Sequence, residues 1–329
     1  MFSDDYPVMH ERLESLARDM RGAYDSLRQK ARDARAKDPG IVMKVQKAQL
    51  DISVGAVDGG LLAGRMHGAD IVMARAAGVI FKYQNSRLET HSYHPSKNPP
   101  PEFEVRDSLE EHEALAFRSL IRLKHELSCA ISLIETYRPQ LMLMDGSLLP
   151  LPADRPAEDS SLRPLYEEVL GLFSKLFSAS SAGGCLLCGV IKDSRSKKLS
   201  KELGAGCTDT VLCGFLLEEG ERTKELGYFE GKAPNKDVGS LGERIKVFYI
   251  RPSKNDLPLR VEVLGGDVAN AASLILTLSS ISENFAYPAV LIEADMRAAL
   301  DPAELERIES SLSALSGLRP LRRNSRPFR

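Results

Sequence analysis

Apolar residues recur along the chain at two spacings, which predict helices and strands. Over residues 8–37 they recur at helical spacing among charged residues, which predicts an amphipathic helix. The Pro and Gly of "KDPGI" end this helix. It either lies on the body of the protein or offers a surface to a partner.

The remaining pattern predicts strands first and then strands alternating with helices. The predicted strands cover residues 51–58, 71–84, 87–96, 141–145, 185–193, 244–252, 257–265 and 289–295. The predicted helices cover residues 108–137, 161–179, 267–283 and 302–315, and residues 96–104 are expected to form a loop. This order predicts an α/β domain built on a mixed β-sheet flanked by helices.

Polar segments suggest how the chain is divided. Residues 194–243 are dominated by Lys, Gly and Glu, and they read as a polar insertion with little regular structure. The tail that begins at Gly317 is basic. We therefore expect an N-terminal helical extension (1–45), one α/β domain (46–300) that carries the insertion, and a C-terminal helix with the basic tail (301–329).

Composition is that of an ordinary globular protein, with 43% hydrophobic and 27% charged residues among 329. The net charge of −2 gives no bulk basicity for binding nucleic acid, although a local basic groove is compatible with it. The acidic N-terminus lacks the apolar core of a secretory signal. No apolar run is long enough to span a membrane. We expect a soluble, cytoplasmic protein with no membrane contact.

The five cysteines do not predict a zinc site. Cys185 and Cys188 form the pair "CLLC", but a structural zinc site needs a second close pair, and Cys207 and Cys213 are too widely spaced. In a strand, residues three apart also point to opposite faces. We interpret the cysteines as buried, reduced thiols.

Two Asp-Gly pairs each follow an apolar strand, Asp58 in "ISVGAVDGGLL" and Asp145 in "MLMDGSLLP". A single Asp-Gly pair is most often a turn. If the two strands are neighbours, however, the two carboxylates converge on one site, where they share a proton or bind a cation. Hard divalent cations prefer such oxygen ligands. The adjacent glycines would let a phosphate backbone come close.

Further charged residues could complete this site. Glu126, in the predicted helix 108–137, lies near the margin of an apolar side, where it is either a third acid or a solvated helix residue. Lys192 ends an apolar strand, where it either offsets charge on a phosphate or simply sits on a wet loop. Asp295 is either a fourth acid or a residue favoured by a helix dipole. Arg195, Lys197 and Lys198 could hold further phosphates.

Taken together, these segments resemble the NurA family of nucleases, which work with the HerA translocase in DNA end processing. The resemblance rests on "VDGG", "RLKHEL", "LMDGSLLP", "GVIKDSRS" and "YPAVLIEAD", in that order, and covers roughly residues 50–300. It implies an RNase H-like fold, a homodimer and docking onto a HerA-type hexameric ATPase. It also implies Mn²⁺-dependent DNA cleavage, with Mg²⁺ as the alternative metal, by 5′-to-3′ exonuclease and single-strand endonuclease activity in double-strand break resection.

The family pattern also implies roles for single residues. Asp58, Glu126 and Asp145 match its metal-binding carboxylates, and Lys192 matches its basic active-site residue. Many members carry a histidine where this chain has Asp295, and an acid there still suits a metal site. Glu113 and Glu135 lie in the same predicted helix as Glu126 and are the alternatives to it. Arg195, Lys197 and Lys198 are expected to contact DNA together with Lys192.

Two other functions are compatible with the same motifs. A non-catalytic adaptor would bind DNA and a motor ring and would use its acids structurally; the N-terminal helix and the basic tail suit that role. An actin-like or sugar-kinase-like ATPase would explain the strand–Asp–Gly motifs but not Lys192 or the size of the chain.

Overall fold

The computed structural model describes residues 7–229, 237–319 and 321, and within them eleven strands form one sheet. The strands are β1 (Val42–Lys44), β2 (Ser53–Met66), β3 (Ala69–Gln84), β4 (Arg87–His94), β5 (Glu102–Asp107), β6 (Leu141–Asp145), β7 (Leu186–Ile191), β8 (Glu221–Thr223), β9 (Leu226–Gly227), β10 (Ile245–Arg251) and β11 (Leu259–Leu264). The helices are α1 (Pro7–Lys37), α2 (Glu111–Tyr137), α3 (Arg163–Gly183), α4 (Lys198–Glu202), α5 (Asp209–Leu216), α6 (Gly239–Gly242), α7 (Val268–Leu278), α8 (Ala289–Ala298) and α9 (Pro302–Ser316).

The sheet is mixed, and its path runs β1-β8-β10-β11-β7-β6-β2-β3-β4, with β5 beside β3 and β9 beside β10. Strands β2, β3 and β4 form an antiparallel meander. β6 is parallel to β2, and β7 is parallel to β6. Strands β6 and β7 end side by side, and the middle of the longer β2 passes beside these ends. In open α/β sheets, ligands bind at the carboxyl ends of parallel strands.

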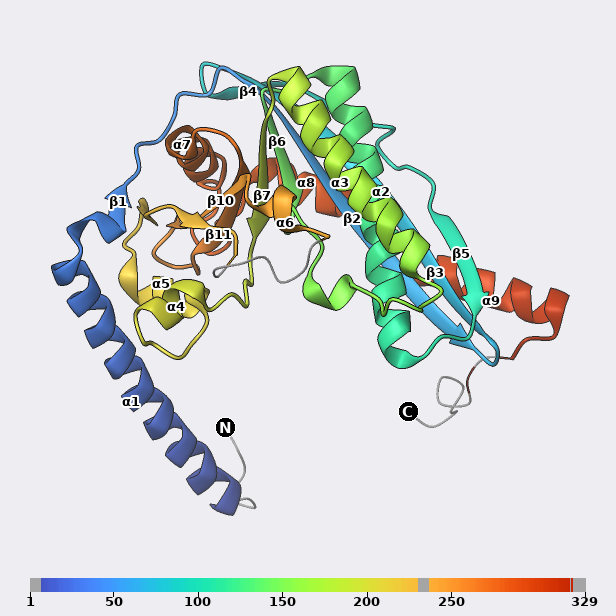
Figure 1. Ribbon diagram of the computed structural model, residues 1–329, viewed down its shortest axis with the longest axis horizontal. Helices are drawn as coiled ribbons and strands as arrows, with labels where there is room; N and C mark the ends of the chain where they lie inside the picture. Colours follow the sequence, from blue (N-terminus) through green and yellow to red (C-terminus); the bar gives the residue numbers. More distant parts are fainter. Residues whose placement is uncertain (1–6, 230–236, 320, 322–329) are drawn as a thin grey trace.

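Helices cover both faces of the sheet, and this confirms the predicted α/β fold with a mixed sheet flanked by helices. Helices α2 and α3 pack side by side on one face, and α7 and α8 cover the other (Figure 1). Each face buries an apolar core because successive strand residues alternate between them. In β6, Met142 and Met144 face α2, whereas Leu141 and Leu143 face α7 and α8.

The first predicted strand is longer than expected, because Asp58 does not end it. β2 pairs with β3 from Ser53 opposite Lys82 to Met66 opposite Ala69, and so it runs straight through Gly59 and Gly60. The two glycines are packing positions. A Cβ on Gly60 would lie 1.9 Å from the Ala298 carbonyl oxygen of α8.

Three further expectations were wrong. Residues 289–295, predicted as a strand, lie in α8, because a short apolar run does not distinguish a buried strand from a buried helix. The 194–243 segment contains α4, α5, α6, β8 and β9, and β8 pairs with β1 and β10, so sheet pairing gives it regular structure. The expected 96–104 loop already enters β5 at Glu102. The basic tail lies outside the described residues from 322 onward.

The body has two projections, which give it the outline of an arch (Figure 1). One is α1, whose C-terminal part packs on α5. The other is the far half of β2 and β3 with β5, and α9 packs against β2 there. No helix within the described ranges is long and apolar enough to cross a membrane.

Candidate functional site

Asp58 and Asp145 lie side by side on neighbouring parallel strands. Val57 of β2 is opposite Met144 of β6, so the next residue on each strand is the aspartate. Both side chains point to the face covered by α7 and α8, because they continue the alternation of Ala56 and Leu143. The two strands are therefore neighbours, which is the condition under which the sequence predicts that the two carboxylates converge.

The Asp58 carboxylate is buried and close to other acids. It is 7% exposed, and its Oδ1 accepts a hydrogen bond from the Gly59 backbone N–H at 2.7 Å. Burial is the largest cause that raises the pKa of Asp58 to about 7, followed by the negative charge of Asp145. A hydrogen bond with Asp295 and the charge of Asp295 also raise it, whereas the hydrogen bond from Gly59 lowers it. Asp295 lies in α8 and is exposed, so it reaches the site from the solvent side.

Glu126 reaches the same acids from the opposite face of β2. It is only 3% exposed, so the interpretation of Glu126 as a solvated helix residue was wrong. Its Oε1 lies 2.4 Å from the position that a Cβ on Gly59 would take, so the missing side chain of Gly59 provides the space for this carboxylate. Burial raises the pKa of Glu126 to about 8; Arg122 opposes the shift, and the charges of Asp58 and Asp145 add to it.

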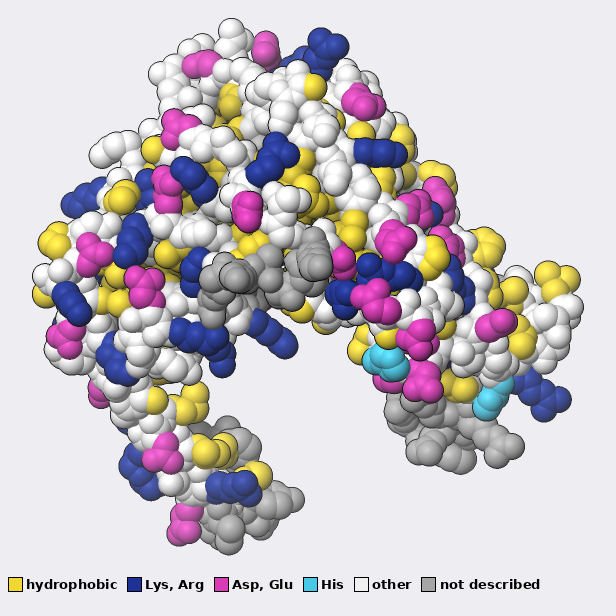
Figure 2. All heavy atoms as spheres, viewed as in Figure 1, with side chains coloured by type: hydrophobic (Ala, Val, Ile, Leu, Met, Phe, Trp, Pro, Cys, Tyr) yellow, Lys and Arg dark blue, Asp and Glu magenta, His cyan; other side chains and the backbone are white. Residues whose placement is uncertain are grey.

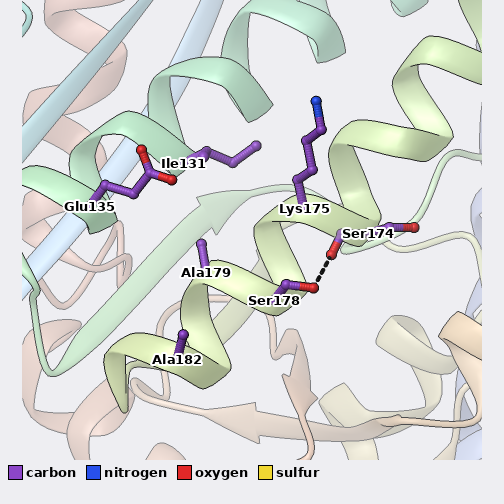
Figure 3. Close-up of a pocket in the computed structure, with 7 residues that line it drawn as sticks. All are labelled: Ile131, Glu135, Ser174, Lys175, Ser178, Ala179 and Ala182. Carbon is purple, nitrogen blue, oxygen red and sulfur yellow. Dashed lines mark hydrogen bonds between the residues drawn. The ribbon is translucent and has the colours of Figure 1, made fainter.

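The two alternative acids of α2 lie elsewhere. The Glu113 Oε1 accepts a hydrogen bond from the Ser160 hydroxyl at 2.6 Å. Glu135 lines a separate hollow of about 480 Å³ between α2 and α3, beside Lys175 and Ser178 (Figure 3). Glu126, by contrast, lies against Gly59, the residue directly after Asp58.

Asp145 is held by two side chains from other elements. Lys192 follows the end of β7, and its Nζ lies 3.0 Å from the Asp145 Oδ2. The Tyr287 hydroxyl lies 3.0 Å from the Asp145 Oδ1 and 3.1 Å from the Val190 carbonyl oxygen, and it donates its one proton between them. The Lys192 Nζ also lies 4.2 Å from the centre of the Tyr287 ring, within range of a cation–π contact.

Sequence reasoning missed Tyr287. It stands inside the quoted "YPAVLIEAD", directly before Pro288, but nothing in the local pattern links it to Asp145. The available signal is general: a tyrosine in an apolar segment needs a hydrogen-bond partner once it is buried. Tyr287 is 2% exposed, and burial raises its pKa well above the usual value, so it stays a protonated donor.

The basic residues after β7 differ in their surroundings. Arg195 and Lys197 are exposed, whereas Lys198 is half-buried. The Lys198 Nζ donates to the carbonyl oxygens of Gly227 at 2.7 Å and Phe229 at 2.5 Å. Lys198 therefore ties α4 to the segment after β9.

The donor chemistry of the site fits a hard divalent cation. Asp58, Glu126, Asp145 and Asp295 offer only oxygen ligands. The pKa values of Asp58 and Glu126 are raised first by burial and then by neighbouring carboxylates, and a bound cation would offset both effects. As the side chains stand, no three His, Cys, Asp or Glu residues in the described part of the chain are arranged to hold an ion. Lys192 engages Asp145 and Arg122 engages Glu126, so a metal would replace these internal cations.

The cysteines take no part in this site. All five are free thiols; four are buried, and Cys207 is partly exposed. Burial raises the pKa of Cys185 to about 12, as expected for inert structural thiols.

Comparison with known proteins gives a consistent result. The NurA domain model matches residues 52–300. The crystal structure of the NurA nuclease from Sulfolobus solfataricus aligns with a TM-score of 0.64 at 17% identity, over 94% of this chain and 96% of that chain. NurA with manganese gives 0.58 at 12% identity, over 93% and 98%. NurA bound to dAMP and manganese gives 0.56 at 12%, over 96% and 98%. No curated protein matches the chain significantly.

At these identities the structural likeness establishes the fold, and it confirms the RNase H-like architecture expected from the sequence. Membership rests on the domain model, which spans well over half of the 329 residues and includes Asp58, Glu126, Asp145, Lys192 and Asp295. This chain belongs to the NurA family.

Proposed function

We propose that this chain is a metal-dependent DNA nuclease. The observation that carries the proposal is the meeting of Asp58 and Asp145 on adjacent parallel strands, with Lys192 on one side and the buried Glu126 on the other. Acids grouped beside a lysine, two of them buried with raised pKa values, are typical of a functional site. Burial and the neighbouring carboxylates raise the pKa of both Asp58 and Glu126.

The residues have distinct roles in this proposal. Asp58, Glu126, Asp145 and Asp295 would hold Mn²⁺ or Mg²⁺. When bound, the cation supplies positive charge for a phosphodiester and the acidity that makes hydroxide available near neutral pH. Lys192 offsets charge that develops on the phosphate in the transition state. Tyr287 fixes the orientation of Asp145. Related crystal structures that contain manganese, one of them with dAMP, support this choice of metal and substrate.

The flanking cations would guide the DNA strand. Lys and Arg side chains line the inner edge of the arch beside α4 and α5 (Figure 2). Arg195 and Lys197 are the exposed basic residues nearest to Lys192 in the chain, and they would contact neighbouring phosphates. Lys198 would contribute chiefly by holding the segment that carries them.

The finer activities come from the family resemblance. We propose 5′-to-3′ exonuclease and single-strand endonuclease action in double-strand break resection, with a homodimer working beside a HerA-type hexameric ATPase. An uncovered apolar face on α1 supports a protein partner, because Leu13, Leu16 and Met20 are 41%, 50% and 56% exposed. Hydrophobic side chains are visible along α1 where it leaves the body (Figure 2).

The deciding experiment is cleavage of end-labelled single- and double-stranded DNA in Mn²⁺, Mg²⁺ or EDTA. Asp58→Asn and Asp145→Asn keep the side-chain size and should abolish metal-dependent cutting while the proteins remain folded. Cutting that survives both changes would place the activity elsewhere. DNA binding without any cutting, even after a HerA-type ATPase is added, would favour the adaptor function.

A further inference from the structure

Asp209 is a buried acid outside the group of carboxylates proposed to bind metal. It is the first residue of α5 and is 0% exposed. Its Oδ2 accepts hydrogen bonds from the Ser196 hydroxyl at 2.8 Å and the Tyr249 hydroxyl at 3.0 Å, and its Oδ1 accepts one from the Ser200 backbone N–H at 2.7 Å. Hydrogen bonds to a carboxylate are stronger than those between neutral groups. This one side chain therefore holds two other parts of the chain against α5, namely residues 196–200 and strand β10.

The backbone that precedes α4 depends on such contacts. Residues 194–197 form neither helix nor strand, so regular backbone pairing does not fix their positions. The Asp209 backbone N–H donates to the Ser196 carbonyl oxygen at 2.8 Å, and the Thr210 hydroxyl donates to the Ser194 carbonyl oxygen at 3.3 Å. Together with the hydrogen bond from the Ser196 hydroxyl, these contacts fix the course of the segment from the side of α5.

The same segment directs two basic side chains outward. Arg195 and Lys197 are exposed, whereas the serine before each of them is half-buried, so cations and anchoring serines alternate along the backbone. Lys192, which pairs with Asp145 at 3.0 Å, lies three residues before Arg195. Three residues span at most about 10 Å of extended chain. Arg195 therefore lies within reach of a phosphate next to the one that the acids would hold, and Lys197 lies within reach of a phosphate further along.

We propose that Asp209 is a positioning residue for DNA binding, which fixes residues 194–200 so that Arg195 and Lys197 meet the phosphates beside the scissile bond. The inference rests on the proposed nuclease function, because it takes DNA as the ligand of this segment. A cation on a fixed backbone loses less conformational entropy on binding than one on a mobile backbone. The anchored segment should therefore raise DNA affinity, whereas the metal-binding acids and Lys192 govern the rate of cutting.

The sign of the effect distinguishes positioning from simple electrostatics. Asp209→Ala removes a negative charge, and this alone would strengthen the binding of a polyanion. If Asp209 positions the segment, the same change should instead weaken DNA binding about tenfold and lower the slope of log Kd against log salt by roughly one to two. Asp209→Asn keeps an oxygen acceptor for the Ser200 N–H and should restore part of the affinity. Asp267→Ala, which removes two hydrogen bonds to backbone N–H groups at the start of α7, is the matched control.

A second variant keeps the inference testable if Asp209→Ala fails to fold. Ser196→Ala removes one hydrogen bond to the carboxylate without a change of charge, and Ser180→Ala, which removes a buried hydrogen bond near the end of α3, is its control. Ser196→Ala should weaken DNA binding about threefold or more, and Ser180→Ala should not. In a chain that already carries Arg195→Ala and Lys197→Ala, Ser196→Ala should have no further effect, because the two cations through which it acts are gone.

Binding is measured by fluorescence anisotropy of labelled DNA in Ca²⁺ over a range of salt concentrations, and cutting by single-turnover kinetics in Mn²⁺. At saturating DNA, the rate of Ser196→Ala should stay within about threefold of wild type. If the folded variants bind DNA as tightly as their controls, or more tightly, the positioning role fails and the nuclease proposal stands. If the variants weaken binding as predicted but wild type cuts no DNA, the positioning role stands and the nuclease proposal fails. Wild type that binds no DNA overturns both.

Discussion

The Lys192 ammonium and the Asp145 carboxylate form an ion pair of 3.0 Å at the ends of two neighbouring parallel strands. The pair is partly open to solvent, with 37% of the Lys192 side chain exposed. Such a pair contributes little to stability. Because Asp145 lies beside Asp58, a metal ion bound by these two acids would release Lys192 from the ion pair, and Lys192 could then bind a phosphate.

Lys192→Met should therefore affect catalysis more than folding. We expect the single-turnover rate in Mn²⁺ to fall roughly 100- to 1,000-fold, because a group that stabilises transition-state charge is lost. DNA affinity should change little, and Lys192→Arg should restore part of the rate. Lys175→Met, in the separate hollow between α2 and α3, is the matched control (Figure 3). A rate for Lys192→Met within a factor of three of the control would argue against this role.

Tyr287→Phe should weaken the site through Asp145. The change keeps the buried ring but removes the hydroxyl that bonds to Asp145 and to the Val190 carbonyl. We expect Mn²⁺ affinity to fall about 10- to 100-fold, as for other residues that orient metal ligands. Stability should fall by about 1 kcal/mol. Calorimetric Mn²⁺ titration and thermal unfolding measure the two effects, and unchanged Mn²⁺ affinity would contradict the positioning role.

The two glycines after Asp58 should respond differently to alanine. In Gly59→Ala the new Cβ meets the Glu126 side chain rather than backbone, so this carboxylate must move and metal binding should be impaired. In Gly60→Ala the Cβ meets the Ala298 backbone at 1.9 Å, and overpacking should cost about 1–3 kcal/mol. Gly171→Ala on α3, where no atom lies within 4 Å, is the control. Denaturant unfolding measures the loss of stability, and Mn²⁺ titration measures the loss of metal binding. Normal Mn²⁺ binding by Gly59→Ala would contradict the prediction for this residue.

Stability without metal should fall as pH rises. The pKa is raised from 3.8 to about 7 for Asp58 and from 4.5 to about 8 for Glu126. Between the ordinary and raised pKa values the folded chain binds more protons than the unfolded chain, so the free energy of unfolding decreases as pH rises.

In EDTA we expect Tm to be roughly 2–4 °C lower at pH 8 than at pH 5.5. Glu126→Gln should flatten this slope, and Mn²⁺ should restore most stability at pH 8. A wild-type slope that Glu126→Gln leaves unchanged would refute the assignment.

The exposed face of α1 should form a contact between two copies of the chain. We expect Leu16→Glu and Met20→Glu together to convert a dimer to a monomer, because charges would be placed in an apolar interface. Leu315→Glu on α9, where Leu315 is 87% exposed, is the control. Light scattering after size exclusion gives the mass directly. A wild-type monomer, or a dimer that survives both charges, would exclude this interface.

The sequence by itself determined most of the alternation of strands and helices, and it singled out Asp58 and Asp145 as neighbouring carboxylates. Local periodicity carries that information, because each strand or helix must bury one face whatever its neighbours are. Asp145 at the end of β6 and Lys192 just after β7 could be located in the same way, because their apolar runs stop at charged residues.

Only the tertiary structure decided the rest of the site. Glu126 is buried because Gly59, more than sixty residues earlier in the chain, leaves space for it, and no local pattern records such a contact. Tyr287 reaches Asp145 only because α8, which begins just after it, packs across β2. Residues 289–298 are helical for the same reason: packing against the sheet, rather than the apolar run itself, selects helix over strand. Contacts between distant segments are set by how the layers pack, and for that reason they appear only in the folded chain.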